Sequence, residues 1–88
     1  MNVTPFAVEW RTEQGAEGVL DVPTVEGQDV ACLAYSPVGQ AGAVAPWCLT
    51  YPGDYRHEAR FKSRQSAMEW VVLYARELRA GIAPIGGE

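Results

Sequence analysis

The sequence lacks most of the patterns on which enzymatic and metal chemistry commonly depend. It holds one histidine and two cysteines in 88 residues, and none of the CxxC, HxxxH or HExxH spacings of metal sites occurs. The glycine patterns that cradle phosphate groups and the GxSxG turn of acyl-transferring enzymes are also missing. We therefore predict a chain that is not an enzyme and that uses no cofactor or metal ion.

Segments that would direct the chain to a membrane are also missing. No apolar run approaches the roughly 20 residues that a spanning helix needs. The opening MNVTPFAVEW has neither the basic nor the apolar region of a secretion signal. We therefore expect a cytoplasmic protein without membrane contact, in which Cys32 and Cys48 are reduced and separate.

Positive charge is scarce in the first part of the chain. The net charge is −4 overall, with −6 over residues 1–54 and +2 over residues 55–88, and no charged residue lies between Val30 and Gly53. An ordinary solvated surface around an apolar middle segment accounts for this distribution. The alternative is an acidic face that docks on a basic surface of another macromolecule.

Five short segments have the composition of strands. Pro23 cannot donate a backbone hydrogen bond, so its strand is expected at a sheet edge, or interrupted there. The segment after it is apolar on both faces, as a central strand is, and the uncharged segment 36–46 is expected to be a loop. The strand candidates are 6–11, 19–25, 29–35, 47–51 and 55–62.

The end of the chain carries the clearest local signals. Tyr51-Pro52-Gly53-Asp54 has Pro and Gly at the two central positions of a type II turn. Ser63 or Ser66 can cap a helix that continues to Ala80, because no Gly or Pro interrupts that segment, and Gly81 can close it. The buried stripe of this helix is expected to hold Ala67, Val71, Tyr74 and Leu78.

These elements predict that residues 1–88 form one domain, which belongs to the α+β class. The expected fold is an antiparallel sheet of about four to five short strands with one C-terminal helix packed on one face.

Residues 45–80 combine a Trp-bearing strand, a Pro-Gly hairpin, a returning strand and the Ser-capped segment FKSRQSA that leads into a helix. This ending resembles that of many small bacterial and phage proteins. With its small size and acidity, the chain resembles the small acidic accessory proteins of phages and prophages, and in general character the anti-CRISPR inhibitors. The resemblance implies a non-catalytic inhibitor that binds a host nucleic-acid-binding complex.

Two surfaces are candidates for contact with a protein partner. One is apolar: Val72 and Leu73 fall off the helix's core stripe and are expected beside the uncharged segment 36–46, the Ala-Gly loop. The other is acidic and would meet a basic surface of the partner. Its residues are Glu9, Glu13, Glu17, Asp21, Glu26 and Asp29.

Three alternatives remain open. A homodimer could cover the part of the sheet that one helix leaves bare. A nucleic-acid-binding module could use the stripe from Arg56 to Arg64, although an acidic chain makes direct nucleic-acid binding the weaker hypothesis. A small ligand-binding or enzymatic domain could use the open sheet face and His57, which is expected to be partly buried on its strand.

Overall fold

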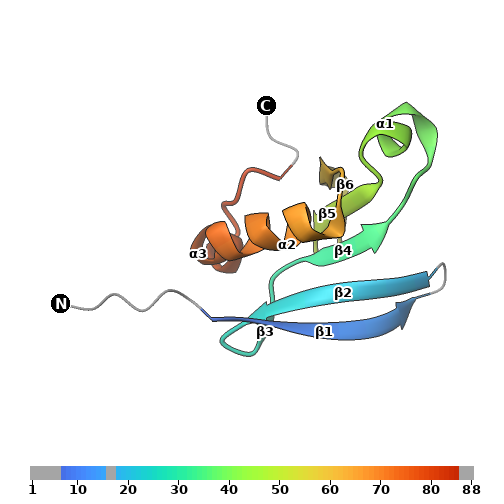
Figure 1. The fold of residues 1–88 in the computed structure, drawn as a ribbon. Coiled ribbons are helices and arrows are strands. Elements are labelled where there is room, and N and C mark those ends of the chain that lie inside the picture. The colour runs from blue at the N-terminus through green and yellow to red at the C-terminus, as the bar shows by residue number, and fades with distance from the viewer. Residues whose placement is uncertain (1–6, 16–17, 86–88) are drawn as a thin grey trace.

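The computed structural model describes residues 7–15 and 18–85 and has an antiparallel sheet with the two C-terminal helices on one face (Figure 1). The strands are β1 (Val8–Gly15), β2 (Gly18–Val25), β3 (Gln28–Asp29), β4 (Cys32–Tyr35), β5 (Trp47–Tyr51) and β6 (Asp54–Phe61). The helices are α1 (Gly39–Val44), α2 (Arg64–Leu73) and α3 (Ala75–Ala80). The described helices include none with the length and apolar composition needed to cross a membrane.

The strands lie in the order β1-β2-β4-β5-β6, and the short β3 pairs with the end of β2. The α+β class and the antiparallel sheet are therefore confirmed. The sheet has more strands than the four to five expected, because the segment predicted as one strand over 29–35 is divided between β3 and β4. The expected loop over 36–46 also contains a helical turn, α1.

Of the two expectations for the strand that holds Pro23, the edge placement is wrong and the interruption at Pro23 is confirmed. β2 is an inner strand, paired along its whole length with β1. Its other side changes partner at Pro23: Leu20 and Asp21 pair with β4, whereas Thr24 and Val25 pair with β3. Because proline has no N–H to donate, it is tolerated at this change of partner, where its carbonyl accepts from the Val30 N–H at 3.0 Å.

The long C-terminal helix is broken into α2 and α3 at Tyr74, whose φ and ψ are −104° and 23°. Both predicted ends are confirmed: the Ser63 hydroxyl accepts from the Ser66 N–H at 3.1 Å, and Gly81 has a φ of +77°. The departure from helical angles at Tyr74 rotates the last turns of the helix. This residue, which was expected in the buried stripe, is therefore only half-buried, and Ala75 takes its place. The other three residues of the stripe are buried as expected: Ala67, Val71 and Leu78.

The core lies between the sheet and α2. Leu33 of β4 and Leu49 of β5 are fully buried at its centre. Residues 82–85, which follow Gly81, are irregular and pack on the sheet. The Tyr51 hydroxyl accepts from the Ala83 N–H at 2.7 Å and donates to the Ala83 carbonyl at 3.2 Å, and Ile85 is buried.

Candidate functional site

A cleft opens between the far end of the β1–β2 hairpin and strand β4. β1 and β2 pair over eight residues, out to Gly15 and Gly18, whereas β2 and β4 share only two pairs, the outer one joining Leu20 to Ala34. Beyond that pair the hairpin and β4 diverge (Figure 1). The resulting space, which we call the β2–β4 cleft, measures about 1450 Å³. Typical small-molecule pockets measure roughly 300–1,000 Å³.

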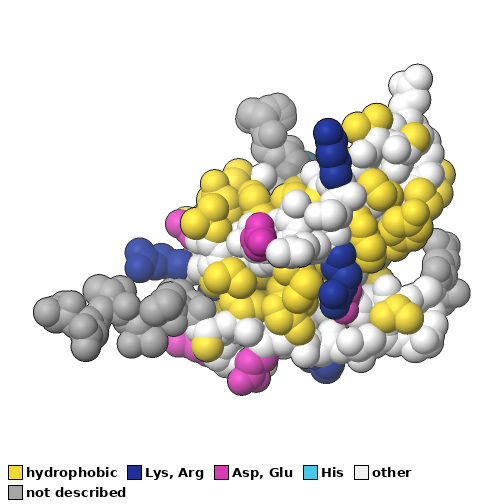
Figure 2. Space-filling model, in the orientation of Figure 1, with side chains coloured by type: hydrophobic (Ala, Val, Ile, Leu, Met, Phe, Trp, Pro, Cys, Tyr) yellow, Lys and Arg dark blue, Asp and Glu magenta, His cyan; other side chains and the backbone are white. Residues whose placement is uncertain are grey.

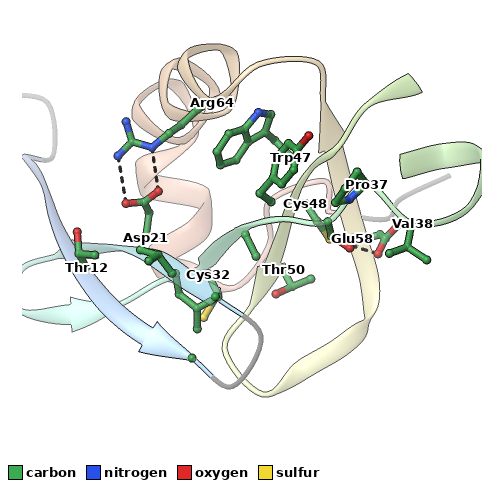
Figure 3. Close-up of a pocket in the computed structure, with 17 residues that line it drawn as sticks. Thr12, Asp21, Cys32, Pro37, Val38, Trp47, Cys48, Thr50, Glu58 and Arg64 are labelled. Carbon is green, nitrogen blue, oxygen red and sulfur yellow. Dashed lines mark hydrogen bonds and ion pairs between the residues drawn. The ribbon is translucent and has the colours of Figure 1, made fainter. Parts of the chain in front are cut away.

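The lining of the β2–β4 cleft comes from many parts of the fold (Figure 3). Arg64, at the start of α2, faces Asp21 of β2 at one end, and Trp47 lies between that pair and the residues that follow β4. The other lining residues are Thr12, Gly15, Gly18, Val19, Leu20, Cys32, Ala34, Tyr35, Ser36, Pro37, Val38, Cys48, Thr50 and Glu58.

One wall of the cleft is continuous with a protruding segment, Ser36–Pro46, which we call the arm. The arm is closed at its base by the Ser36 N–H, which donates to the Pro46 carbonyl at 2.6 Å. Arg60 of β6 also holds this base, because its Nη1 donates to the carbonyls of Ser36 at 2.8 Å and Ala45 at 3.1 Å. The arm is therefore fixed to the sheet at both of its ends.

Close packing within the arm depends on Gly42. It is the one buried residue of α1, and a Cβ at this position would lie 2.7 Å from the carbonyl carbon of Pro37 and 2.8 Å from the Ser36 carbonyl oxygen. Those atoms belong to the backbone and cannot move aside cheaply. The helical turn therefore packs directly on the base of the arm, which gives the arm one defined shape.

Large apolar side chains are exposed around the arm and the cleft. Val38 and Val44 on the arm are 75% and 67% exposed, and Tyr35 and Val19 beside the cleft are 59% and 54% exposed. Tyr35 packs edge-on against Trp47, with ring centroids 5.1 Å apart. Figure 2 shows this part of the surface as a hydrophobic region over α1 and the end of β4. Exposed apolar groups that gather in this way mark contact sites.

The charged groups of the cleft neutralise one another. Arg64 donates from Nε and Nη2 to both carboxylate oxygens of Asp21, at 2.9 and 3.1 Å. Arg60 donates from Nε to Glu58 at 2.6 Å, and this hydrogen bond, with a second from Cys48, lowers the pKa of Glu58. The cleft therefore offers a ligand apolar surface and paired charges rather than a net charge.

The two cysteines are free thiols, as predicted, and are poorly suited to nucleophilic chemistry. Burial is the larger of two causes that raise the pKa of Cys48 to about 11, and the second is the 3.3 Å hydrogen bond that its thiol donates to Glu58. Burial also raises the pKa of Cys32. Since the thiolate is the reactive form of cysteine, both side chains stay protonated and unreactive near neutral pH.

The acidic residues singled out in the sequence are mostly held in ion pairs. Glu13 and Asp29 both bind Arg11, and Asp29 does so through two hydrogen bonds of 2.9 Å. Asp21 is buried against Arg64, and the Glu26 carboxylate lies 3.5 Å from Arg79. Glu9 is exposed, and Glu17 lies outside the described residues. Contact between these acids and a partner stays a prediction.

Val72 and Leu73 are exposed, as expected from the helical stripe. They lie at the end of α2 that leads into α3, whereas α1 stands at the opposite side of the molecule (Figure 1). The structure therefore separates this helix surface from the Ala-Gly loop beside which it was expected.

His57 and the basic stripe also differ from expectation. The His57 side chain is 54% exposed rather than partly buried, and its nearest charged partner is Asp54, 3.5 Å away. The register shift between Thr50 and Tyr51 explains the exposure, because β6 departs from regular pairing there. Arg60 and Arg64 are already paired with carboxylates, which leaves fewer free cations on the stripe than the sequence indicates.

Within residues 7–15 and 18–85, no group of three or more His, Cys, Asp or Glu side chains could hold a metal ion.

Sequence reasoning missed the cleft and the role of Arg60. The only signal for the cleft was the uncharged segment that contains the arm.

Comparisons of the chain with protein-family models, with curated proteins and with solved structures found no match.

Proposed function

We propose that this chain is a non-catalytic protein-binding module whose contact surface is the arm together with the β2–β4 cleft. The observation that carries the proposal is the grouping of exposed Val38 and Val44, on an arm held at its base by Arg60, with exposed Val19 and Tyr35 beside the cleft. A rigid apolar surface binds well because little conformational freedom is lost on association.

The chemistry of the cleft favours a protein partner over a substrate. Its two thiols are protonated near neutral pH, and its two ion pairs are internally satisfied, so it offers neither a nucleophile nor a free general base. Its volume of about 1450 Å³ exceeds that of typical small-molecule pockets and suits a segment of a folded partner.

The mode of contact follows from the paired charges. Without a net charge on the cleft, binding should depend on apolar burial and change little with salt. The more specific proposal, an inhibitor of a basic nucleic-acid-binding complex, needs the acidic residues instead. In that case salt should weaken binding, because exposed charges are screened.

Site-specific photocross-linking tests the proposal. A benzophenone amino acid would replace Val38 or Val44 in the arm, and Leu73 on α2 would carry it in the matched control, since Leu73 is equally exposed but lies away from the arm. In nuclease-treated lysate of the source cells, the arm positions should cross-link to one protein and Leu73 should not. Cross-links from Leu73 alone would overturn the assignment of the surface.

A further inference from the structure

The outer side of β1 is a free sheet edge. β1 is the first strand in the order β1-β2-β4-β5-β6, and among the described residues only β2 pairs with it. A free edge presents backbone N–H and C=O groups that can pair with another strand. Such pairing supplies affinity through the backbone, while alternate side chains supply specificity.

The direction of the backbone groups follows from two contacts on β2. The Pro23 carbonyl points away from β1, because it accepts from Val30 on the other side of β2. Its partner Trp10 therefore has its own N–H and C=O directed away from β2, toward the free edge. Glu9 has the opposite orientation, since its carbonyl accepts from the Thr24 hydroxyl of β2 at 3.2 Å. By alternation, the backbone groups of Val8, Trp10 and Thr12 face outward.

The side chains of β1 divide into an acidic and an apolar face. Glu9, Arg11 and Glu13 project from the face opposite α2, and Asp29 of β3 joins them through Arg11. Three carboxylates therefore accompany one guanidinium. Val8 and Trp10 project to the other face and pack half-buried against the core. Figure 2 shows acidic side chains along the lower border of the molecule, where β1 and β3 run in Figure 1.

This arrangement specifies the strand that would fit. Every second residue of an added strand would lie beside the acidic face, and the intervening residues would lie beside Val8 and Trp10. A second copy of β1 fits poorly, because its own excess of carboxylates would meet the same excess here. We propose that the β1 edge binds an extended basic segment of a partner protein, in which Lys or Arg alternates with apolar residues.

Titration with a synthetic peptide tests this proposal without the natural partner. The probe is a capped nonapeptide in which Lys alternates with Val, and the controls replace Lys with Glu or scramble the alternation. The alternating Lys-Val peptide should bind at least tenfold more tightly than either control. On binding, the outward amides of Trp10 and Thr12 should gain protection from hydrogen exchange, whereas the inward amides of Arg11 and Glu13 should be protected throughout.

Two changes separate strand pairing from plain charge attraction. Thr12→Pro removes an outward N–H without removing a bond to β2, and N-methylation of alternate peptide amides removes the same pairing without altering the protein. Each should weaken binding at least tenfold, and Glu9→Lys should do so as well, with Glu69→Lys on α2 as a control without effect. Val38→Asp should bind the peptide normally, which keeps this test independent of the proposed function.

Three results would overturn the proposal. One is the absence of peptide binding at millimolar concentration. Another is binding that Glu9→Lys abolishes but peptide N-methylation leaves unchanged, which would indicate adhesion to the acidic surface without strand pairing. The third is a stable dimer of the chain whose protected amides lie on β1, because a second copy would then occupy the edge.

Discussion

Replacing Arg60 with leucine should release the arm while leaving the sheet folded. Arg60 lies on β6, its side chain is only 16% exposed, and its Nη1 donates to the carbonyls of Ser36 and Ala45 at the two ends of the arm. Leucine retains much of the apolar stem but has no donor. Both carbonyls would then lose their partner, and Glu58 would lose its 2.6 Å hydrogen bond.

The magnitude follows from those hydrogen bonds. A buried hydrogen bond to a charged group contributes about 1.5–3 kcal/mol, and an exposed pair contributes much less. The two carbonyls are part-buried at the base of a surface segment, where water can replace some of the lost donors. We therefore expect Arg60→Leu to lower the free energy of unfolding by about 2 kcal/mol, which is less than the roughly 3–6 kcal/mol that two fully buried bonds of this kind would contribute together.

Hydrogen exchange and chemical denaturation together test this expectation. The Ser36 amide, bonded to the Pro46 carbonyl, and the Ala45 amide, bonded to the Ala41 carbonyl, should exchange at least tenfold faster in Arg60→Leu. Amides of β5 should change only with global stability. Arg56→Leu on the same strand is the matched control and should change stability by less than about 0.5 kcal/mol. Unchanged exchange at Ser36 and Ala45 would refute the role of Arg60 in holding the arm.

Three further predictions concern the core, the thiols and pH. Leu78→Ala should lower the free energy of unfolding by about 2–4 kcal/mol, because it opens a cavity where the side chain is buried, whereas exposed Leu73→Ala should have little effect on a denaturation curve. Cys32 and Cys48 should react slowly with iodoacetamide at pH 7.5 in the native protein and fully in denaturant, and a native mass two units below that of the reduced chain would contradict the free thiols. Because Arg60 lowers the pKa of Glu58 in the folded state, the Glu58 carboxylate stabilises the fold above its unfolded pKa of about 4.5, and this contribution is lost as pH falls below that value. Glu58→Gln should therefore flatten the pH dependence of stability between about pH 5 and pH 3, and an unchanged profile would exclude the effect.

The features that the sequence predicts correctly depend on neighbouring residues. The Pro52-Gly53 turn forms with a φ of +80° at Gly53, because glycine alone adopts that angle without strain. The cap at Ser63 and the left-handed Gly81 are local in the same sense, since each needs only atoms within one turn of the helix. These signals can be identified before any tertiary contact is known.

The features that sequence reasoning missed depend on residues far apart in the chain. The β2–β4 cleft results from a difference in pairing length, eight residues with β1 against two with β4, which no local pattern encodes. Arg60 reaches carbonyls 15 and 24 residues away, and Arg64 binds Asp21 across 43 residues. Composition gives the charges but does not show which of them form ion pairs. Residues that the sequence indicates as free acids or as a basic stripe are largely held in ion pairs in the structure.

The most direct test of the central claim measures how the cross-linked partner binds three variants at 0.1 and 0.5 M salt. Val38→Asp with Val44→Asp places charge on the arm, Leu73→Asp alters the helix surface, and Glu9→Lys alters the acidic face. We expect the arm variant to lose at least a hundredfold in affinity at both salt concentrations and the other two to lose less than threefold. Full affinity of the arm variant, with losses confined to Glu9→Lys or Leu73→Asp, would contradict the assignment of binding to the arm and the β2–β4 cleft.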